Sequence, residues 1–157
     1  IPSFDFNALY SYPLSWLEIT ILNNYCNLYR RHTPSKGILY FYKVLEYCDS
    51  SALDILALKR FFAVTVNNLI GALYSQKRFS ELTELDTYFT SPAVKCSLHL
   101  YSTILANYAQ ALGETLQLTS SSLALYYAYY NLLITNDSKN ANLFKTFIYN
   151  DFGINLI

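Results

Sequence analysis

Asparagine is the residue type in this sequence whose positions most clearly suggest a chemical role. Asparagines recur inside segments with helical periodicity, among them Asn23, Asn24, Asn27, Asn67, Asn68 and Asn107. Asparagine is a weak helix former, because its side chain competes for backbone hydrogen bonds. A carboxamide offers both a donor and an acceptor, so it can hold the backbone of an extended peptide of any sequence. For a single asparagine, a bond to a neighbouring helix or to water is the simpler explanation, but the recurring set favours peptide binding.

The residue types that usually carry catalysis or hold metals form no convincing group. His32 and His99 are far apart in the sequence, and neither has a carboxylate or a cysteine at metal-ligand spacing. The glycines are isolated in the sequence, which excludes a phosphate-binding loop. We therefore predict a protein without enzymatic activity, metal or cofactor. An enzyme that uses His99 and Glu114 is the weakest of the alternatives.

The length and charge of the chain limit which other functions are compatible with the sequence. The chain has 157 residues, enough for one domain with its own core, so residues 1–157 are treated as a single domain. Hydrophobic residues make up 53% of it and charged residues 14%, and the formal net charge is 0. A neutral chain has no bulk attraction for nucleic acid or for an anionic membrane. Any contact with DNA is therefore expected through a domain outside this segment.

The cysteines and apolar runs suggest where the chain resides. Cys26, Cys48 and Cys96 are odd in number and share no metal-like spacing, which predicts buried thiols in a reducing, cytoplasmic compartment. The longest uncharged apolar run, at positions 123–134, is too short to cross a bilayer. No signal-peptide pattern opens the chain. Because it starts at Ile1 and contains no methionine, we expect a fragment of a longer protein.

Helix start and stop signals divide the chain into seven helices with short joints and no convincing strand. The predicted helices cover about residues 13–31, 35–48, 51–75, 80–89, 92–112, 119–136 and 140–151. Pro34 and Pro92 suit first helical positions, whereas Gly113 suits a helix stop. The apolar stripe of the longest helix must be buried; it consists of Leu58, Phe62, Val66, Leu69 and Leu73. The fold class is therefore all-α.

The predicted helices alternate between long and short, which suggests a repeat of helix pairs. Asn24, Asn68 and Asn107 occupy matching places in the three long helices, and their separations fall within the range of such repeats. In stacked helix pairs, the first helices line a concave wall. Aligning the three long helices on Asn24, Asn68 and Asn107 therefore predicts a peptide-binding groove, and these three asparagines support it. The residues of the groove are Asn23, Asn27, Arg31, Arg60, Asn67, Thr103 and Gln110.

The last two predicted helices are rich in aromatic residues. Four tyrosines surround most of the helix at residues 119–136, which favours core packing, with an interface as the alternative; they are Tyr126, Tyr127, Tyr129 and Tyr130. The final segment has more apolar residues than a free end would expose. It predicts a cap on the last repeat or a homodimer contact, formed by Phe144, Phe147, Ile148 and Phe152.

Three stretches together point to a family: LSWLEITILNNYCNLYRRHTPSKGILYFYKVLEYC, ALKRFFAVTVNNLIGALYSQKRFSELTELDTYF and KCSLHLYSTILANYAQALG. They resemble the C-terminal domain of Rgg/GadR/MutR-type transcriptional regulators, peptide-pheromone receptors of Gram-positive bacteria, over roughly residues 10–152. The resemblance implies a right-handed superhelix of tetratricopeptide-like antiparallel helix pairs with a short signalling peptide on its concave face. It also implies a homodimer and a helix-turn-helix DNA-binding domain before Ile1. In such receptors asparagine and arginine side chains hold the peptide backbone, which here maps onto Asn23, Asn27, Arg60 and Asn67.

The resulting functional prediction is the regulatory domain of an intracellular transcription regulator. A short signalling peptide would shift the domain between two arrangements and so control an attached DNA-binding domain. The alternative is a helical-repeat adaptor that mediates protein–protein interaction and does not bind DNA. The two differ in footprint, because a peptide would cover the asparagine column whereas an adaptor's partner would cover the side of residues 126–130.

Overall fold

The structure is a computed structural model that describes residues 15–50, 56–89, 91–95 and 98–134. Every regular element in these ranges is a helix, which confirms the all-α prediction. The described helices are α1 (Trp16–His32), α2 (Pro34–Ser50), α3 (Leu56–Ser75), α4 (Phe79–Thr83), α5 (Asp86–Phe89), α6 (Pro92–Lys95), α7 (Leu98–Glu114) and α8 (Leu118–Ile134). The helix predicted at 140–151, together with Phe144, Phe147, Ile148 and Phe152, lies outside the described residues.

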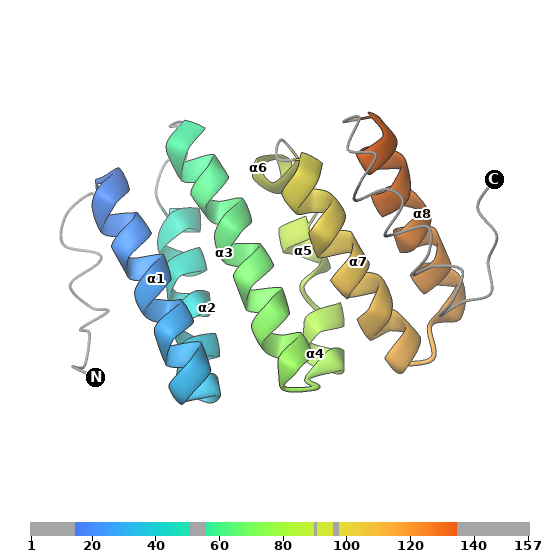
Figure 1. Ribbon diagram of the computed structural model, residues 1–157, viewed down its shortest axis with the longest axis horizontal. Helices are drawn as coiled ribbons and strands as arrows, with labels where there is room; N and C mark the ends of the chain where they lie inside the picture. The colour runs from blue at the N-terminus through green and yellow to red at the C-terminus, as the bar shows by residue number, and fades with distance from the viewer. Residues whose placement is uncertain (1–14, 51–55, 90, 96–97, 135–157) are drawn as a thin grey trace.

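Each of the five long helices has an antiparallel neighbour, because α1 packs on α2, α2 on α3 and α7 on α8. Figure 1 shows α1, α3 and α7 side by side, with α2 and the short helices α4–α6 behind them and α8 beyond α7. Helix α3 is central, because it contacts α1, α2, α4, α6 and α7. One face of each of α1, α3 and α7 is therefore turned away from the layer of α2 and α4–α6.

The core lies on the side of α3 that carries its apolar stripe. Val66, Leu69 and Leu73 are fully buried and Phe62 nearly so, which confirms the prediction for the described members of the stripe. They belong to one hydrophobic cluster that also includes residues of α1, α2, α4 and α7. A fully buried leucine or phenylalanine contributes about 1.5–3 kcal/mol. On the opposite side of α3, Val64, Asn67 and Gly71 are partly buried, and Ser75 at the end of the helix is exposed.

Local signals in the sequence explain where the first two helices begin. The Ser15 hydroxyl accepts from the Glu18 N–H, and the Glu18 carboxylate accepts in return from the Ser15 N–H, at 3.4 Å and 2.7 Å. This capping box starts α1 at Trp16. Pro34 occupies the first position of α2, as predicted, where its missing N–H costs nothing. The Gly37 N–H donates to the Thr33 carbonyl at 3.0 Å and closes the first turn of α2.

Helices α3 and α7 end with the same backbone geometry. After α3, the Arg78 N–H donates to the Leu73 carbonyl at 3.0 Å, and Lys77 adopts a φ of 54°. After α7, the Gln117 N–H makes the same kind of bond at 2.8 Å, and Leu116 adopts a φ of 62°. Both ends are Schellman motifs, in which the left-handed position usually carries glycine. Lys77 and Leu116 are separated along the chain by the same interval as Asn68 and Asn107.

Two predictions of helix boundaries are wrong. Gly113 does not stop α7, which continues to Glu114, because the left-handed residue of the motif is Leu116. The predicted fourth helix divides into α4 and α5, since the Glu84 N–H turns back onto the carbonyls of Glu81 and Leu82. Within the predicted fifth helix the structure describes α6 and α7, and residues 96–97 between them lie outside the described ranges. The division of the predicted fourth helix is one reason why eight helices are described where about seven were predicted for the whole chain.

The sequence also predicted buried thiols and an apolar run that is too short to cross a bilayer. Cys26 and Cys48 are buried and free, as expected, and burial raises the pKa of the Cys26 thiol to about 12. Cys96 lies outside the described residues. Among the helices of the described ranges, none has the length and apolar character needed to cross a membrane.

Candidate peptide-binding surface

Two of the predicted asparagines join α1 to α3. The Asn23 side chain is 9% exposed, and its Oδ1 accepts from the Asn68 Nδ2 at 3.1 Å. One turn further along α1, the Asn27 Nδ2 donates to the Asn23 main-chain carbonyl at 3.2 Å. Hydrogen bonds of this kind stabilise by about 0.5–1.5 kcal/mol each. The Asn23–Asn68 bond therefore gives both residues a role in helix packing, in addition to any role in binding.

Asn67 differs from these two asparagines because its acceptor is not satisfied. Its Oδ1 is buried and has no hydrogen-bond partner among the described residues. A buried polar atom without a partner costs about 1–3 kcal/mol, so it calls for a functional explanation or an unseen donor. By the sequence alignment Asn67 and Asn107 correspond to Asn23 and Asn68, yet the Asn67 Oδ1 does not accept the equivalent bond. Asn67 is therefore the asparagine with unused hydrogen-bonding capacity.

Arg30 is a site residue that the sequence prediction missed. It is partly buried in the last turn of α1, and its Nη1 donates to the Asn68 main-chain carbonyl of α3 at 3.4 Å. The guanidinium lies over Gly71, where an added Cβ would be 3.3 Å from Nη1. Burial, and then the positive charge of Arg31, lower the pKa of Arg30. Its spacing from Asn23 and Asn27, at i+7 and i+3, was the signal that could have identified it.

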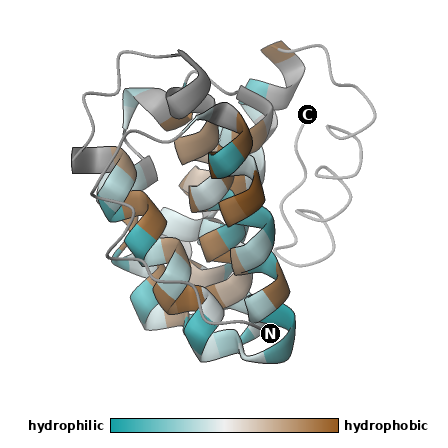
Figure 2. Cartoon of the chain, turned by 90° about the vertical axis from the view of Figure 1, so that its left-hand side faces the viewer, coloured by the Kyte–Doolittle hydropathy of each residue, from teal (hydrophilic) through white to brown (hydrophobic). Residues whose placement is uncertain are grey.

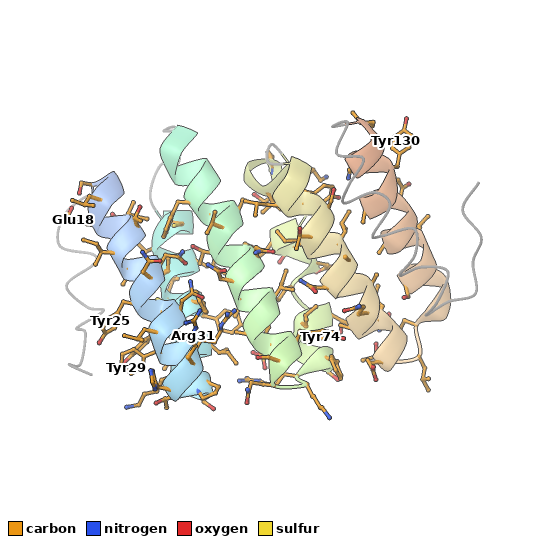
Figure 3. The ribbon with its side chains drawn as sticks, in the orientation of Figure 1. Glu18, Tyr25, Tyr29, Arg31, Tyr74 and Tyr130 are labelled. Atoms are coloured by element: carbon orange, nitrogen blue, oxygen red, sulfur yellow. The ribbon has the colours of Figure 1, made fainter. Side chains whose placement is uncertain are left out.

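The predicted cations occupy different environments. Arg31 is exposed near the C-terminal end of α1. Figure 3 shows Arg31 beside the lower half of α1, and Tyr25 and Tyr29 on the outer, left-hand side of the same helix. Tyr29 packs edge-to-face on Tyr40 of α2, with ring centroids 4.9 Å apart, so this aromatic cluster belongs to the α1–α2 contact. Arg60 is in α3, but its side chain is not among those that the structure describes.

Two of the predicted site residues lie on α7, the next helix of the row. Thr103 and Gln110 are both partly buried on α7, which packs against α3. The structure thus brings Asn23, Asn27 and Arg30 together with α3 through named contacts or a shared helix face. It places Thr103 and Gln110 on the next helix of the row.

The supporting asparagine column is not uniform. Asn68 and Asn107 are partly buried, whereas Asn24 is exposed. The difference follows from the position of each helix in the row. Asn68 on α3 faces α1, whereas Asn24 is on α1, the first helix described, which has no described helix on its outer side. Asn24 shares that outer face with Leu17, Ile21 and Leu28, which are exposed too. Figure 2 views the molecule from this end and shows hydrophobic residues among hydrophilic ones.

The candidate residues offer hydrogen bonds and positive charge. Amide donors and acceptors and the Arg30 guanidinium suit reversible binding of a polar backbone. Within the described ranges, no three His, Cys, Asp or Glu side chains gather where they could hold a metal. His32 is exposed as the last residue of α1, and the His99 side chain is not described. We refer to the candidate set of Asn27 and Arg30 on α1, Asn67 on α3, and Thr103 and Gln110 on α7 as the amide surface.

Comparison of the chain with protein-family models, with curated proteins and with solved structures finds no match to any of them. The resemblance to Rgg/GadR/MutR-type regulators therefore remains a prediction from the sequence.

Proposed function

We propose that the amide surface binds a short extended peptide. The observation that carries the proposal is the buried Oδ1 of Asn67, which lacks a donor among the described residues. It lies on the same stripe of α3 as Gly71, on which the Arg30 guanidinium rests. A peptide backbone supplies N–H donors for such an acceptor and carbonyl acceptors for the Arg30 guanidinium. Rotation of the Asn67 carboxamide would bring its oxygen to the ligand.

The proposed context is the ligand-sensing domain of an intracellular transcription regulator. The family resemblance supports this context, as does the prediction of a right-handed superhelix of helix pairs. The matching ends of α3 and α7, at Lys77 and Leu116, are consistent with such a repeat. In this proposal, peptide binding favours one packing of α1 against α3, and an attached helix-turn-helix domain responds. A homodimer, with the apolar residues of the final segment at its contact or as a cap, belongs to the same proposal.

Affinity selection from a randomised peptide library tests the binding function. The 157-residue chain is incubated with heptapeptides, separated from free peptide by gel filtration, and the retained peptides are identified by mass spectrometry. We expect retained peptides for the wild type, and at least a tenfold loss of retention for Asn67→Ala. Asn27→Ala should weaken retention as well, because Asn27 is on the same face of α1 as Arg30.

Asn24→Ala is the matched control for this experiment. It removes the same side chain from α1, but from the exposed outer face of the helix. Retention by Asn24→Ala should equal that of the wild type. If no peptide is retained by any variant, or if Asn24→Ala and Asn67→Ala behave alike, the amide surface is not a peptide site.

One observation favours an adaptor as the second candidate function. Leu123, Tyr127, Tyr130 and Ile134 follow helical spacing on α8, and at least half of each side chain is exposed. The prediction that these tyrosines pack in the core is therefore wrong for Tyr127 and Tyr130, because α8 is the last described helix and packs mainly against α7. Such a stripe suits a protein partner. If Tyr127→Ala and Tyr130→Ala abolish a protein interaction that Asn67→Ala preserves, the adaptor function is supported.

A further inference from the structure

The Arg30 guanidinium lies against α3 and lacks a counter-ion among the described residues. Arg30 is partly buried, and its described hydrogen bond is to the main-chain carbonyl of Asn68 at 3.4 Å. A guanidinium carries five donors and stays charged at any physiological pH, so most of its donors remain available. Removing part of a charge from water is unfavourable unless an opposite charge or hydrogen bonds compensate.

The acidic residues of the described ranges do not supply that compensation. The two ion pairs found there are local ones, Lys43 with Glu46 and Arg78 with Glu81. Glu18 accepts from Ser15 in the capping box at the opposite end of α1. The charge that acts on Arg30 is the positive charge of Arg31, which opposes it.

A purely structural explanation accounts for only part of this arrangement. Cations in the last turn of a helix interact favourably with its dipole, and exposed Arg31 and His32 already fill that role for α1. Dipole compensation does not require Arg30 to reach across to α3. The guanidinium can do so because Gly71 has no side chain, and an added Cβ would lie only 3.3 Å from Nη1. Glycine in a helix interior is destabilising relative to alanine, so its presence at position 71 calls for a reason.

We propose that Arg30, resting on Gly71 beside Asn67, binds a carboxylate of the peptide ligand. This inference rests on the proposed peptide-binding function and specifies the chemistry of the ligand. A guanidinium and a carboxylate form two parallel hydrogen bonds, a geometry that a planar fork favours. A singly charged group suits the site better than a dianion, because the negative end of the α1 dipole lies nearby. The carboxylate can be the peptide's C-terminus or an acidic side chain.

Three synthetic mixtures distinguish these sources. Each is a randomised heptapeptide mixture made from the same uncharged residues: one has a free C-terminal carboxylate, one a C-terminal amide, and one a C-terminal amide with a single fixed glutamate. Retention by the 157-residue chain is measured by gel filtration and mass spectrometry. A charge-assisted pair is worth about tenfold or more in affinity, so the neutral amide mixture should be retained about tenfold less. Retention of the first mixture alone assigns the C-terminus, and comparable retention of the third assigns any peptide carboxylate.

Variants at two positions test the residue assignment. Arg30→Gln should reduce retention of the carboxylate mixtures to that of the neutral mixture, whereas Lys95→Gln, which removes an exposed cation from α6, should not. Gly71→Glu places an internal carboxylate beside Arg30 and should reduce retention of the carboxylate mixtures as Arg30→Gln does. Gly71→Gln should preserve more of the preference for carboxylate mixtures over the neutral mixture than Gly71→Glu does. Gly71→Glu also keeps the arginine, so it tests the inference if Arg30→Gln fails to fold.

The outcomes separate the two proposals. If the wild type retains the neutral mixture as well as the carboxylate mixtures, or if Arg30→Gln and Gly71→Glu keep the preference, the carboxylate assignment is overturned while peptide binding stands. If none of the mixtures is retained, peptide binding itself is refuted, and the carboxylate assignment falls with it.

Discussion

Replacing Gly37 by alanine should destabilise the fold, because α1 and α2 meet there through their backbones. An added Cβ at Gly37 would lie 2.4 Å from the Arg30 main-chain nitrogen, 2.5 Å from its Cα and 2.9 Å from its Cβ. Ordinary van der Waals contact begins at 3.4 Å, so the two helices would have to separate by about 3.4 − 2.4 = 1.0 Å. Neither side of this contact can rotate away.

The expected magnitude follows from two opposing effects. Alanine is better than glycine in a helix by about 0.8–1 kcal/mol, which favours the variant. Forcing packed elements apart typically costs about 1–3 kcal/mol and occasionally more. The contact lies beside buried Ile38 and Phe41, which would lose dispersion contacts across a gap of about 1 Å, so we place the cost at the upper end. The net loss is then about 2 kcal/mol.

Urea unfolding monitored by far-UV circular dichroism measures this difference in the free energy of unfolding. In thermal unfolding, the same loss should lower the Tm of a chain of this size by about 4–8 °C. Gly71→Ala is the matched control, because its Cβ would meet only the end of the Arg30 side chain, at 3.3 Å. We expect Gly71→Ala to be unchanged or more stable by up to about 1 kcal/mol. A Gly37→Ala variant as stable as Gly71→Ala would refute the close approach of α1 and α2.

Three further predictions concern a helix end, an interhelical bond and a buried thiol. Leu116→Gly should stabilise the chain by about 0.5–1 kcal/mol in urea unfolding, because Leu116 is 84% exposed and has a φ of 62°, and a loss of stability would contradict the left-handed geometry. A double-mutant cycle of Asn23→Ala and Asn68→Ala should give a coupling of about 1 kcal/mol, and additive effects would argue against the bond. The Cys26 thiol has a higher pKa folded, about 12, than unfolded, so its stabilising contribution is complete below the unfolded pKa and is lost as pH rises toward 12. Urea midpoints should therefore fall above about pH 9, less steeply for Cys26→Ala, and equal slopes would contradict this burial.

The sequence was sufficient to predict most helices because their starts depend on local chemistry. Pro34 fixes its own φ and lacks an N–H, so its place at the first position of α2 needs no tertiary information. The end of α7 could not be predicted in the same way. Gly113 has the residue type of a stop, but the left-handed position belongs to Leu116, further along the chain, which is an unfavourable residue for it. Residue preference alone therefore does not decide where α7 ends.

The candidate site shows a similar division between what spacing predicts and what packing decides. Helical spacing placed Asn23 and Asn27 on one stripe of α1 that was predicted to line a groove, whereas the Asn68–Asn23 bond shows that Asn23 is turned toward α3. Spacing could not choose between Arg30 and Arg31, which lie at i+7 and i+8 from Asn23. That choice depends on which neighbour leaves room for a guanidinium, and the room comes from α3 at Gly71.

The two interior glycines separate the needs of the fold from those of the site. Gly37 is required by backbone packing, because any Cβ there meets the main chain of α1. Gly71 meets no backbone, and the contact found for its added Cβ is with the end of the Arg30 side chain. Backbone packing would therefore accept alanine at position 71 and gain helix stability. A glycine there helps only a guanidinium that must lie against α3, which is the arrangement that carboxylate binding at Arg30 requires.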